Sequence, residues 1–190
     1  MNRQRIERLL TLFALVIGGM RVATGETAAP LRPLVEISAQ RLLLAEKVAL
    51  AKWDSGAAVE DRPREAEVIQ KAVKDGSAIG LDSTLVEAFF RAQIEANKLV
   101  QYSLLADWQR DGKAPAHPPV DLGKEVRPQL DEIEKRLVVE LSSTVSIRTG
   151  ANCRLVVAKA VGQYLDAHKL KPDSREAVAL DRAMAAACTL

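Results

Sequence analysis

Basic side chains occur at a spacing that could bring them to one small anionic ligand. Arg41 and Lys52 are eleven residues apart, which is three helical turns to within about 20°, so both project from one side of a helix. Arginine binds carboxylates through paired hydrogen bonds, and a lysine ammonium supplies a compact positive charge. Such pairs most often line a solvated helix face, so this pair by itself does not define a site.

A second group lies at the predicted start of the next helix, in the segment that holds Asp61, Arg64 and Glu65. The first turn of a helix presents unpaired N–H groups and the positive end of the helix dipole, which together favour an anion. Simple capping explains Asp61 and Glu65 equally well, because acidic residues stabilise a first turn. Both explanations remain open at this stage.

A pair of amides, Asn97 and Gln101, lies four residues apart and therefore on one helix face. They could be ordinary surface residues. However, they occur between Ile94 and Leu105 in a segment otherwise rich in core residues, and this position favours a polar pocket lined by both amides.

The elements that must position these residues are helical. Alternating strand patterns are scarce, and Ala, Leu, Glu, Lys and Arg recur at helical spacing. The patterns predict an all-α, single-domain bundle of about six helices. Their expected ranges are 34–53, 61–75, 83–108, 121–145, 152–167 and 174–188, with a proline-containing loop over 109–121.

The N-terminal residues are typical of a secretory signal peptide, because three arginines precede an apolar run of about a dozen residues. We expect residues 1–25 to be the signal, with cleavage between 25 and 29. An uncleaved anchor or a buried first helix are the alternatives. Removal of 1–25 takes four of 27 basic and one of 25 acidic residues. The remaining 23 and 24 give a nearly neutral chain, which argues against nucleic-acid binding.

Cys153 and Cys188 are the two cysteines of the sequence. In an exported chain they predict one disulfide, and two buried thiols are the alternative. Their spacing does not suit a metal site.

His117 and His168 each lack a nearby partner for metal or triad chemistry, and the sequence has no glycine-rich phosphate loop.

Taken together, these residues resemble the helical, AroQ-type chorismate mutases. The order Arg41, Lys52, Asp61-x-x-Arg64-Glu65 and Asn97-x-x-x-Gln101 matches that family's active-site order. The segments RLLLAEKVALAKW, DRPREAEVIQ and FFRAQIEANKLVQYSLLADW look like the exported gamma subclass, most closely over 34–131. The resemblance implies conversion of chorismate to prephenate without a cofactor or a metal.

The resemblance also implies roles for individual residues. Arg41 and Arg64 would hold the substrate's carboxylates, and Lys52 and Gln101 would donate to the ether oxygen of the breaking bond. Asp61, Glu65 and Asn97 would lie near the substrate hydroxyl or the ring carboxylate. Arg127 is the candidate for the remaining carboxylate arginine, which this subclass takes from the same chain, and Arg110 and Lys124 compete for that role.

The same resemblance predicts a mutase domain over 30–190, with catalytic helices over 30–110 and a C-terminal helical half over 121–190. It also implies a homodimer in the periplasm or secreted from the cell. The alternative hypothesis is a non-enzymatic exported binding or adaptor protein that uses a mutase-like scaffold.

Overall fold

The computed structural model describes residues 28–188, and within that range every regular element is helical. The predicted signal peptide, 1–25, lies outside the described residues. In chain order the helices are η1 (Ala29–Leu31), α1 (Arg32–Leu43), α2 (Ala45–Ser55), α3 (Arg62–Ala78), α4 (Ser83–Asp111), η2 (Leu122–Val126), α5 (Arg127–Ser143), α6 (Val145–Arg148), α7 (Cys153–Ala167) and α8 (Arg175–Met184). The prediction of an all-α fold is confirmed.

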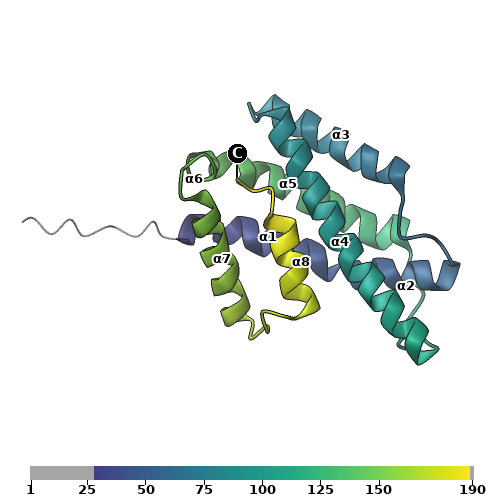
Figure 1. Cartoon of the computed structure of the whole chain (residues 1–190). Coiled ribbons are helices and arrows are strands. Elements are labelled where there is room, and N and C mark those ends of the chain that lie inside the picture. Colours follow the sequence, from purple (N-terminus) through teal and green to yellow (C-terminus); the bar gives the residue numbers. More distant parts are fainter. Residues whose placement is uncertain (1–27, 189–190) are drawn as a thin grey trace, which may run out of the picture.

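The long helix α4 is the centre of the bundle. It packs against α8, α3 and α2, while α1 packs against α5, α7 and α8. Figure 1 shows α4 running through the middle of the molecule, with α3 on one side and the yellow α8 on the other. Residues far apart in the sequence therefore meet along α4 and α1.

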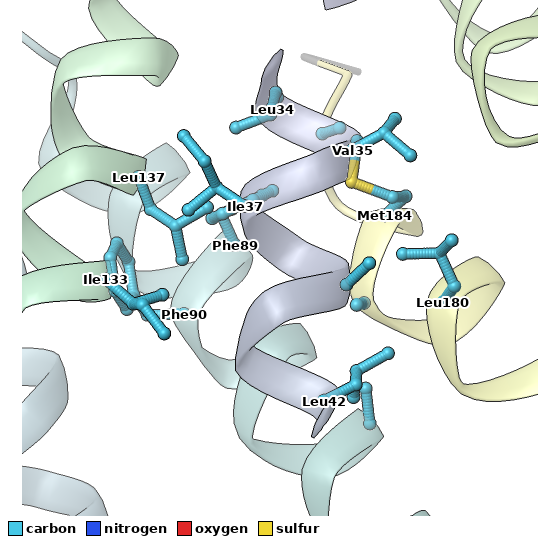
Figure 2. Close-up of a cluster of buried hydrophobic side chains, with 14 of the residues drawn as sticks. Leu34, Val35, Ile37, Leu42, Phe89, Phe90, Ile133, Leu137, Leu180 and Met184 are labelled. Atoms are coloured by element: carbon cyan, nitrogen blue, oxygen red, sulfur yellow. The ribbon is translucent and has the colours of Figure 1, made fainter. Parts of the chain in front are cut away.

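The main core forms around α1. Leu34, Val35, Ile37 and Leu42 on this helix are buried. Figure 2 shows them beside side chains from three other helices, namely Phe89 and Phe90 of α4, Ile133 and Leu137 of α5, and Leu180 and Met184 of α8. Each such side chain stabilises the fold by about 1.5–3 kcal/mol when fully buried. This packing fixes α1, which carries Arg41.

Side-chain caps and glycines set most helix boundaries near the predicted positions. Asp61, Asp82 and Ser174 each accept a hydrogen bond from a backbone N–H in the first turn of α3, α4 and α8. Gly56 and Gly112 end α2 and α4 with positive φ angles of 66° and 72°, which glycine adopts without strain.

The structure corrects the expected ranges in three places. The helix predicted over 34–53 is divided at Leu44 into α1 and α2. The helix predicted over 121–145 begins with η2, a π-helical segment capped by Asp121, before α5. The last helix was predicted to reach residue 188, but α8 ends at Met184. With the short α6, these breaks raise the number of helical segments above the expected six within 28–188.

The predicted disulfide is confirmed. Cys153, the first residue of α7, is bonded to Cys188, and the two Cα atoms are 5.8 Å apart. The bond attaches the end of the described chain to α7, beyond the last turn of α8.

Among residues 28–188, no helix has the length and apolar character needed to cross a membrane.

Candidate active site

One cavity collects all eight site residues predicted from the sequence. Its walls are formed by residues of α1, α2, α3, α4, η2, α5 and the loop before α3. The predicted residues that line it are Arg41, Lys52, Asp61, Arg64, Glu65, Asn97, Gln101 and Arg127. The apolar part of the wall is made of Val48, Val59, Val68, Ile94, Leu122, Val126 and Leu130. The cavity thus combines a cationic interior with apolar surfaces, as small-ligand sites do.

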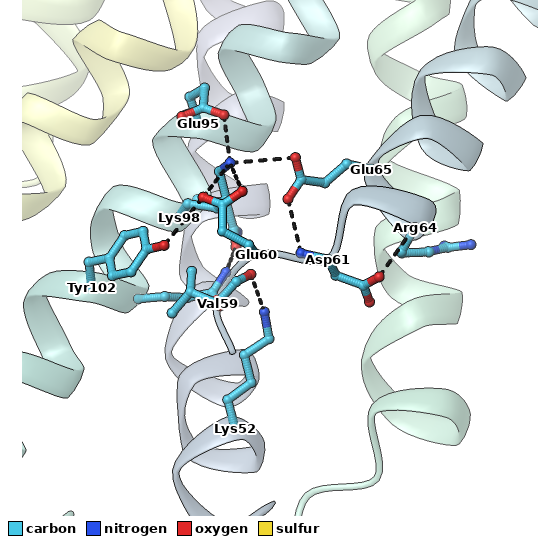
Figure 3. Close-up of polar contacts among 11 residues, drawn as sticks. Lys52, Val59, Glu60, Asp61, Arg64, Glu65, Glu95, Lys98 and Tyr102 are labelled. Carbon is cyan, nitrogen blue, oxygen red and sulfur yellow. Dashed lines mark hydrogen bonds and ion pairs between the residues drawn. The ribbon is translucent and has the colours of Figure 1, made fainter. Parts of the chain in front are cut away.

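Lys52 reaches the cavity from the last turn of α2. Its Nζ donates a hydrogen bond to the Val59 carbonyl at 2.6 Å, as Figure 3 shows. Burial lowers the pKa of Lys52 below its ordinary value, and the carboxylates of Asp61 and Glu65 oppose that change. An ammonium has three N–H donors, so Lys52 can keep the Val59 bond and still donate to a ligand.

The start of α3 shows that Asp61 and Glu65 act as capping residues. The Asp61 carboxylate accepts from the Arg64 backbone N–H at 3.2 Å, and the Glu65 carboxylate accepts from the Asp61 N–H at 3.2 Å (Figure 3). The two side chains therefore satisfy donors that the first helical turn leaves unpaired. Because both residues also line the cavity, the capping role and a ligand-binding role coexist.

The side chain of Arg64 is held by acidic residues of two helices. Its guanidinium donates to Asp131 of α5 at 2.9 Å and to Glu67 at 3.3 Å. Burial lowers the pKa of Arg64, but the bonds to Glu67 and Asp131 outweigh it and raise the pKa above the ordinary value. Arg64 is therefore a fixed positive charge at the cavity wall.

Arg41 is only 5% exposed, although it is charged. Its Nη1 donates to the Gln93 carbonyl at 2.9 Å, and its Nη2 lies 3.9 Å from a carboxylate oxygen of Glu134. The Nε atom is buried and has no hydrogen-bond partner. A buried guanidinium with an unused donor beside a cavity is suited to binding a carboxylate.

The two amides form a chain of hydrogen bonds that begins at the break between α1 and α2. Asn97 Nδ2 donates to the Arg41 carbonyl at 3.2 Å, and Gln101 Nε2 donates to Asn97 Oδ1 at 2.7 Å. Arg41 lies in the last turn of α1, where carbonyls lack helical partners. The Arg41 carbonyl thus sets the orientation of Asn97, and Asn97 sets that of Gln101. The second N–H of the Gln101 amide is not needed for this contact.

Arg127, at the start of α5, lines the cavity, whereas its two competitors do not. Arg110 pairs with Asp107, and Lys124 pairs with Asp121 at 3.9 Å. Within residues 28–188, the side chain of Arg127 has no hydrogen-bond or ion-pair partner. It is therefore available to a ligand at the exposed side of the cavity.

Two charged residues of the cavity were missed by the sequence analysis, namely Lys98 and Glu134. Glu134 is buried between apolar neighbours of α5 such as Ile133 and Leu137. In the sequence Glu134 stands among charged residues, but it falls at helical spacing on the apolar stripe of Leu130, Leu137 and Leu141. An acid on such a stripe is the signal that could have found it.

Lys98 is buried within a group of acidic side chains rather than aimed at a ligand. Its Nζ lies 2.7 Å from Glu95, 3.1 Å from Glu60 and 3.4 Å from Glu65, as Figure 3 shows. Burial lowers the pKa of Lys98, but the bonds to Glu95 and Glu60 and the charge of Glu65 raise it above the ordinary value. Lys98 therefore ties the segment before α3 to α4 and holds Glu65 in its cap.

The charged residues of the cavity indicate the class of ligand that it can bind. Five cations line the cavity, while two of its three acids, Asp61 and Glu65, are engaged in capping. Among the residues that the structure describes, no group of three or more His, Cys, Asp or Glu side chains could hold a metal ion. The protein is an all-helical bundle with a cationic cavity suited to a small molecule that carries more than one negative charge.

Comparisons with known proteins place this bundle in a family. The sequence model of the family described as chorismate mutase type II matches residues 32–102. A secreted chorismate mutase of Mycolicibacterium smegmatis is 32% identical over 169 residues, which cover 89% of this chain and 93% of the relative. The chain belongs to the chorismate mutase family.

Two crystal structures extend the likeness to the fold. A chorismate mutase from Burkholderia phymatum has a TM-score of 0.81 and 42% identity, covering 86% of this chain and 98% of that one. A chorismate mutase from Burkholderia thailandensis has a TM-score of 0.79 and 33% identity, covering 84% of this chain and 99% of that one. The likeness therefore includes α5 to α8, which lie beyond the matched residues 32–102.

Proposed function

We propose that this protein is a chorismate mutase that converts chorismate to prephenate in the cavity lined by Arg41, Lys52 and Gln101. The observation that carries the proposal is the convergence of four cationic side chains, from α1, α2, α3 and α5, on one cavity. Chorismate is a dicarboxylate, and its rearrangement breaks a C–O bond while a C–C bond forms. This unimolecular reaction needs no nucleophile, redox group or proton relay.

The arginines serve to select the reactive shape of the substrate. Arg41 and Arg64 each offer a guanidinium held by protein contacts, and Arg127 adds a third at the exposed side. Two carboxylates held at fixed points restrict a flexible dianion to a chair-like conformer, in which the carbons that must join are close. Restricting the substrate in this way removes part of the entropic barrier.

Lys52 and Gln101 serve to stabilise charge on the ether oxygen. Negative charge grows on that oxygen as the C–O bond breaks, so donors aimed at it bind the transition state more strongly than the substrate. Lys52 is fixed by the Val59 carbonyl, and Gln101 is fixed by Asn97. Preorganised donors of this kind contribute about 3–4 kcal/mol each to lowering the barrier.

The decisive test is the loss of chorismate absorbance catalysed by the purified, oxidised protein, with prephenate identified after acid conversion to phenylpyruvate. Lys52→Ala should lower kcat by at least about 10²-fold while the helical circular dichroism is retained. Lys47→Ala is the matched control, because Lys47 is an exposed lysine of the same helix. Turnover near the wild-type value in Lys52→Ala would overturn the role of Lys52. A folded wild type without turnover would favour a non-enzymatic binding protein.

Export of this chain is supported by its similarity to secreted chorismate mutases of Mycolicibacterium smegmatis and Mycobacterium tuberculosis. We propose that residues 1–25 act as a signal peptide, that cleavage occurs between 25 and 29, and that residues 30–190 form one mutase domain. The cavity takes Arg41 from the 30–110 part and Arg127 from the 121–190 part, which supports a single domain. Mass spectrometry of protein recovered outside the cytoplasm would identify its first residue and so test the cleavage site.

We further propose a homodimer in which each site lies within one chain. The position of Arg127 on the same cavity as Arg41 and Lys52 supports a site that needs no residue from a partner. Sedimentation equilibrium measures the mass in solution. A fully active monomer would contradict the proposed dimer, but it would agree with a site that lies within one chain.

A further inference from the structure

Glu134 is a buried acid whose charge is poorly compensated. The residue is 3% exposed and lines the cavity from α5. Its Oε1 atom is buried and accepts no hydrogen bond, and the nearest cationic nitrogen, Arg41 Nη2, is 3.9 Å away. A buried carboxylate usually gains hydrogen bonds that offset its loss of hydration, and Glu134 lacks them on this oxygen.

The surrounding charges are largely engaged elsewhere. Arg41 of α1 faces Glu134 but donates its Nη1 to the Gln93 carbonyl. Arg64 and Lys71 of α3 also act on Glu134, yet Arg64 is bonded to Asp131 and Lys71 to Asp75.

Asp131, on α5 itself, adds negative charge near Glu134. Burial raises the pKa of Glu134, Arg41 opposes that change, and Asp131 reinforces it. The environment therefore favours the neutral acid more than an ordinary surface site does.

We propose that Glu134 binds the substrate as a neutral acid, holding a proton and donating a hydrogen bond to the ligand carboxylate that Arg41 binds. This inference rests on the proposed function, since it requires a dicarboxylate in the cavity. A ligand carboxylate beside Arg41 brings a second negative charge close to Glu134, and two neighbouring carboxylates favour a shared proton. The proton comes from solvent water or buffer and forms the O–H bond of Glu134, and no bond between heavy atoms changes.

The same helix offers a contrast that supports a special role for Glu134. Asp131 lies one turn earlier on α5 and is bonded at 2.9 Å to Arg64, so it already has its cation. Glu132 points away from the cavity and pairs with Lys135 on the exposed face. Glu134 alone among these three acids lines the cavity.

The test is calorimetric binding of prephenate, a dicarboxylate that is not consumed, between pH 6.5 and 9.5. Buffers of different ionisation enthalpy report how many protons are taken up on binding. The proteins compared are the wild type, Glu134→Gln, and Glu132→Gln as the matched control. Glutamine keeps the shape of the protonated acid and cannot titrate.

We expect the wild type and Glu132→Gln to take up a proton that Glu134→Gln does not. Towards alkaline pH, the wild-type affinity should fall tenfold per pH unit relative to that of Glu134→Gln. Lys52 titrates in all three proteins, so it cancels from this ratio. If Glu134→Gln does not give the wild-type circular dichroism, Glu134→Met replaces it, because it too lacks the acid.

An affinity ratio that is constant with pH, together with equal proton uptake in all three proteins, would overturn the inference and leave Glu134 as an ionised counter-ion of Arg41. Conversion of chorismate by the wild type is measured separately. Its absence counts against the proposed function, whereas proton uptake on binding prephenate decides the role of Glu134.

Discussion

Arg41 and Arg148 are both buried arginines, with exposed fractions of 5% and 1%, yet they differ in how their donors are used. All three side-chain nitrogens of Arg148 donate, to Thr144 Oγ1 at 3.2 Å and to the carbonyls of Ala187 and Leu141 at 3.3 and 2.7 Å. Arg41 leaves its Nε without a partner and holds Glu134 only at 3.9 Å. The comparison teaches that a buried guanidinium whose three nitrogens all donate to the protein supports the fold, whereas one with an unpartnered nitrogen beside a cavity supports binding.

The two regions around these arginines differ in the same way. Arg148 joins the end of α5 to the segment after α8, next to the bond between Cys153 and Cys188. The cavity around Arg41 contains buried polar atoms of Gln101 and Glu134 that have no hydrogen-bond partner. Such atoms cost stability in a closed core, and a bound ligand can satisfy them.

The largest expected effect is on catalysis, from Arg41→Ala. We expect kcat/KM to fall by about 10³-fold, which corresponds to about 4 kcal/mol of transition-state stabilisation, because a carboxylate of the substrate loses its paired donors. Initial rates of chorismate loss measure this. Arg91→Ala is the matched control, since Arg91 is an exposed arginine that pairs with Glu87. A loss below tenfold in Arg41→Ala would break the assignment of Arg41 to the substrate.

The next effect is on stability, from replacing both cysteines by serine. The bond closes a loop with a sequence separation of 35, and its removal should lower the free energy of unfolding by up to about 4 kcal/mol in the chain-entropy model. Urea denaturation measures the change. At a temperature where the variant stays folded, kcat should remain within about twofold of the wild type, because the bond lies outside the residues that line the cavity.

Arg148→Met should act on the fold in the same region with a smaller effect. The change leaves the carbonyls of Leu141 and Ala187 without their donor, and each unsatisfied buried group costs about 1–3 kcal/mol. We expect the free energy of unfolding to fall by about 3 kcal/mol and kcat/KM of the folded protein to be unchanged. If kcat/KM fell as it does in Arg41→Ala, the distinction between the two arginines would be wrong.

The smallest effect concerns the pH dependence of the ether-oxygen donors. An amide donates at any pH, and Glu134 is already neutral in the complex, so kcat at saturating chorismate should be nearly flat from mildly acidic to mildly alkaline pH. It should then fall as Lys52 loses its proton. Since burial lowers the pKa of Lys52, this fall begins below the pH at which an exposed lysine titrates.

In Gln101→Glu the donor must be a protonated acid, so kcat should drop tenfold per pH unit above the pKa of that acid. Initial rates of both proteins at saturating chorismate between pH 5 and 9 check the difference. Equal profiles would contradict a contact between Gln101 and the ether oxygen.

The local signals of the sequence predicted most helices, and the resemblance to the AroQ-type mutases predicted eight of the residues that line the cavity. Asp61, Asp82 and Ser174 cap helices that begin within a residue of the predicted starts, because a capping hydrogen bond involves residues close in the chain. The break at Leu44 has no glycine or proline to mark it. Its effect is nonetheless important, because the Arg41 carbonyl at the end of α1 anchors Asn97 and, through it, Gln101.

What the sequence by itself determined is the helical class, the expectation of one disulfide between its two cysteines, and, through the family resemblance, eight of the residues that line the cavity. Periodicity, caps and motif order can all be read along the chain. Only the tertiary structure decided how each charge is used. Lys98 became bound to Glu60, Glu65 and Glu95, and Glu134 became a buried acid beside Arg41. The reason is physical: burial and the distance between helices set the state of a charge, and neither is encoded in residue spacing alone.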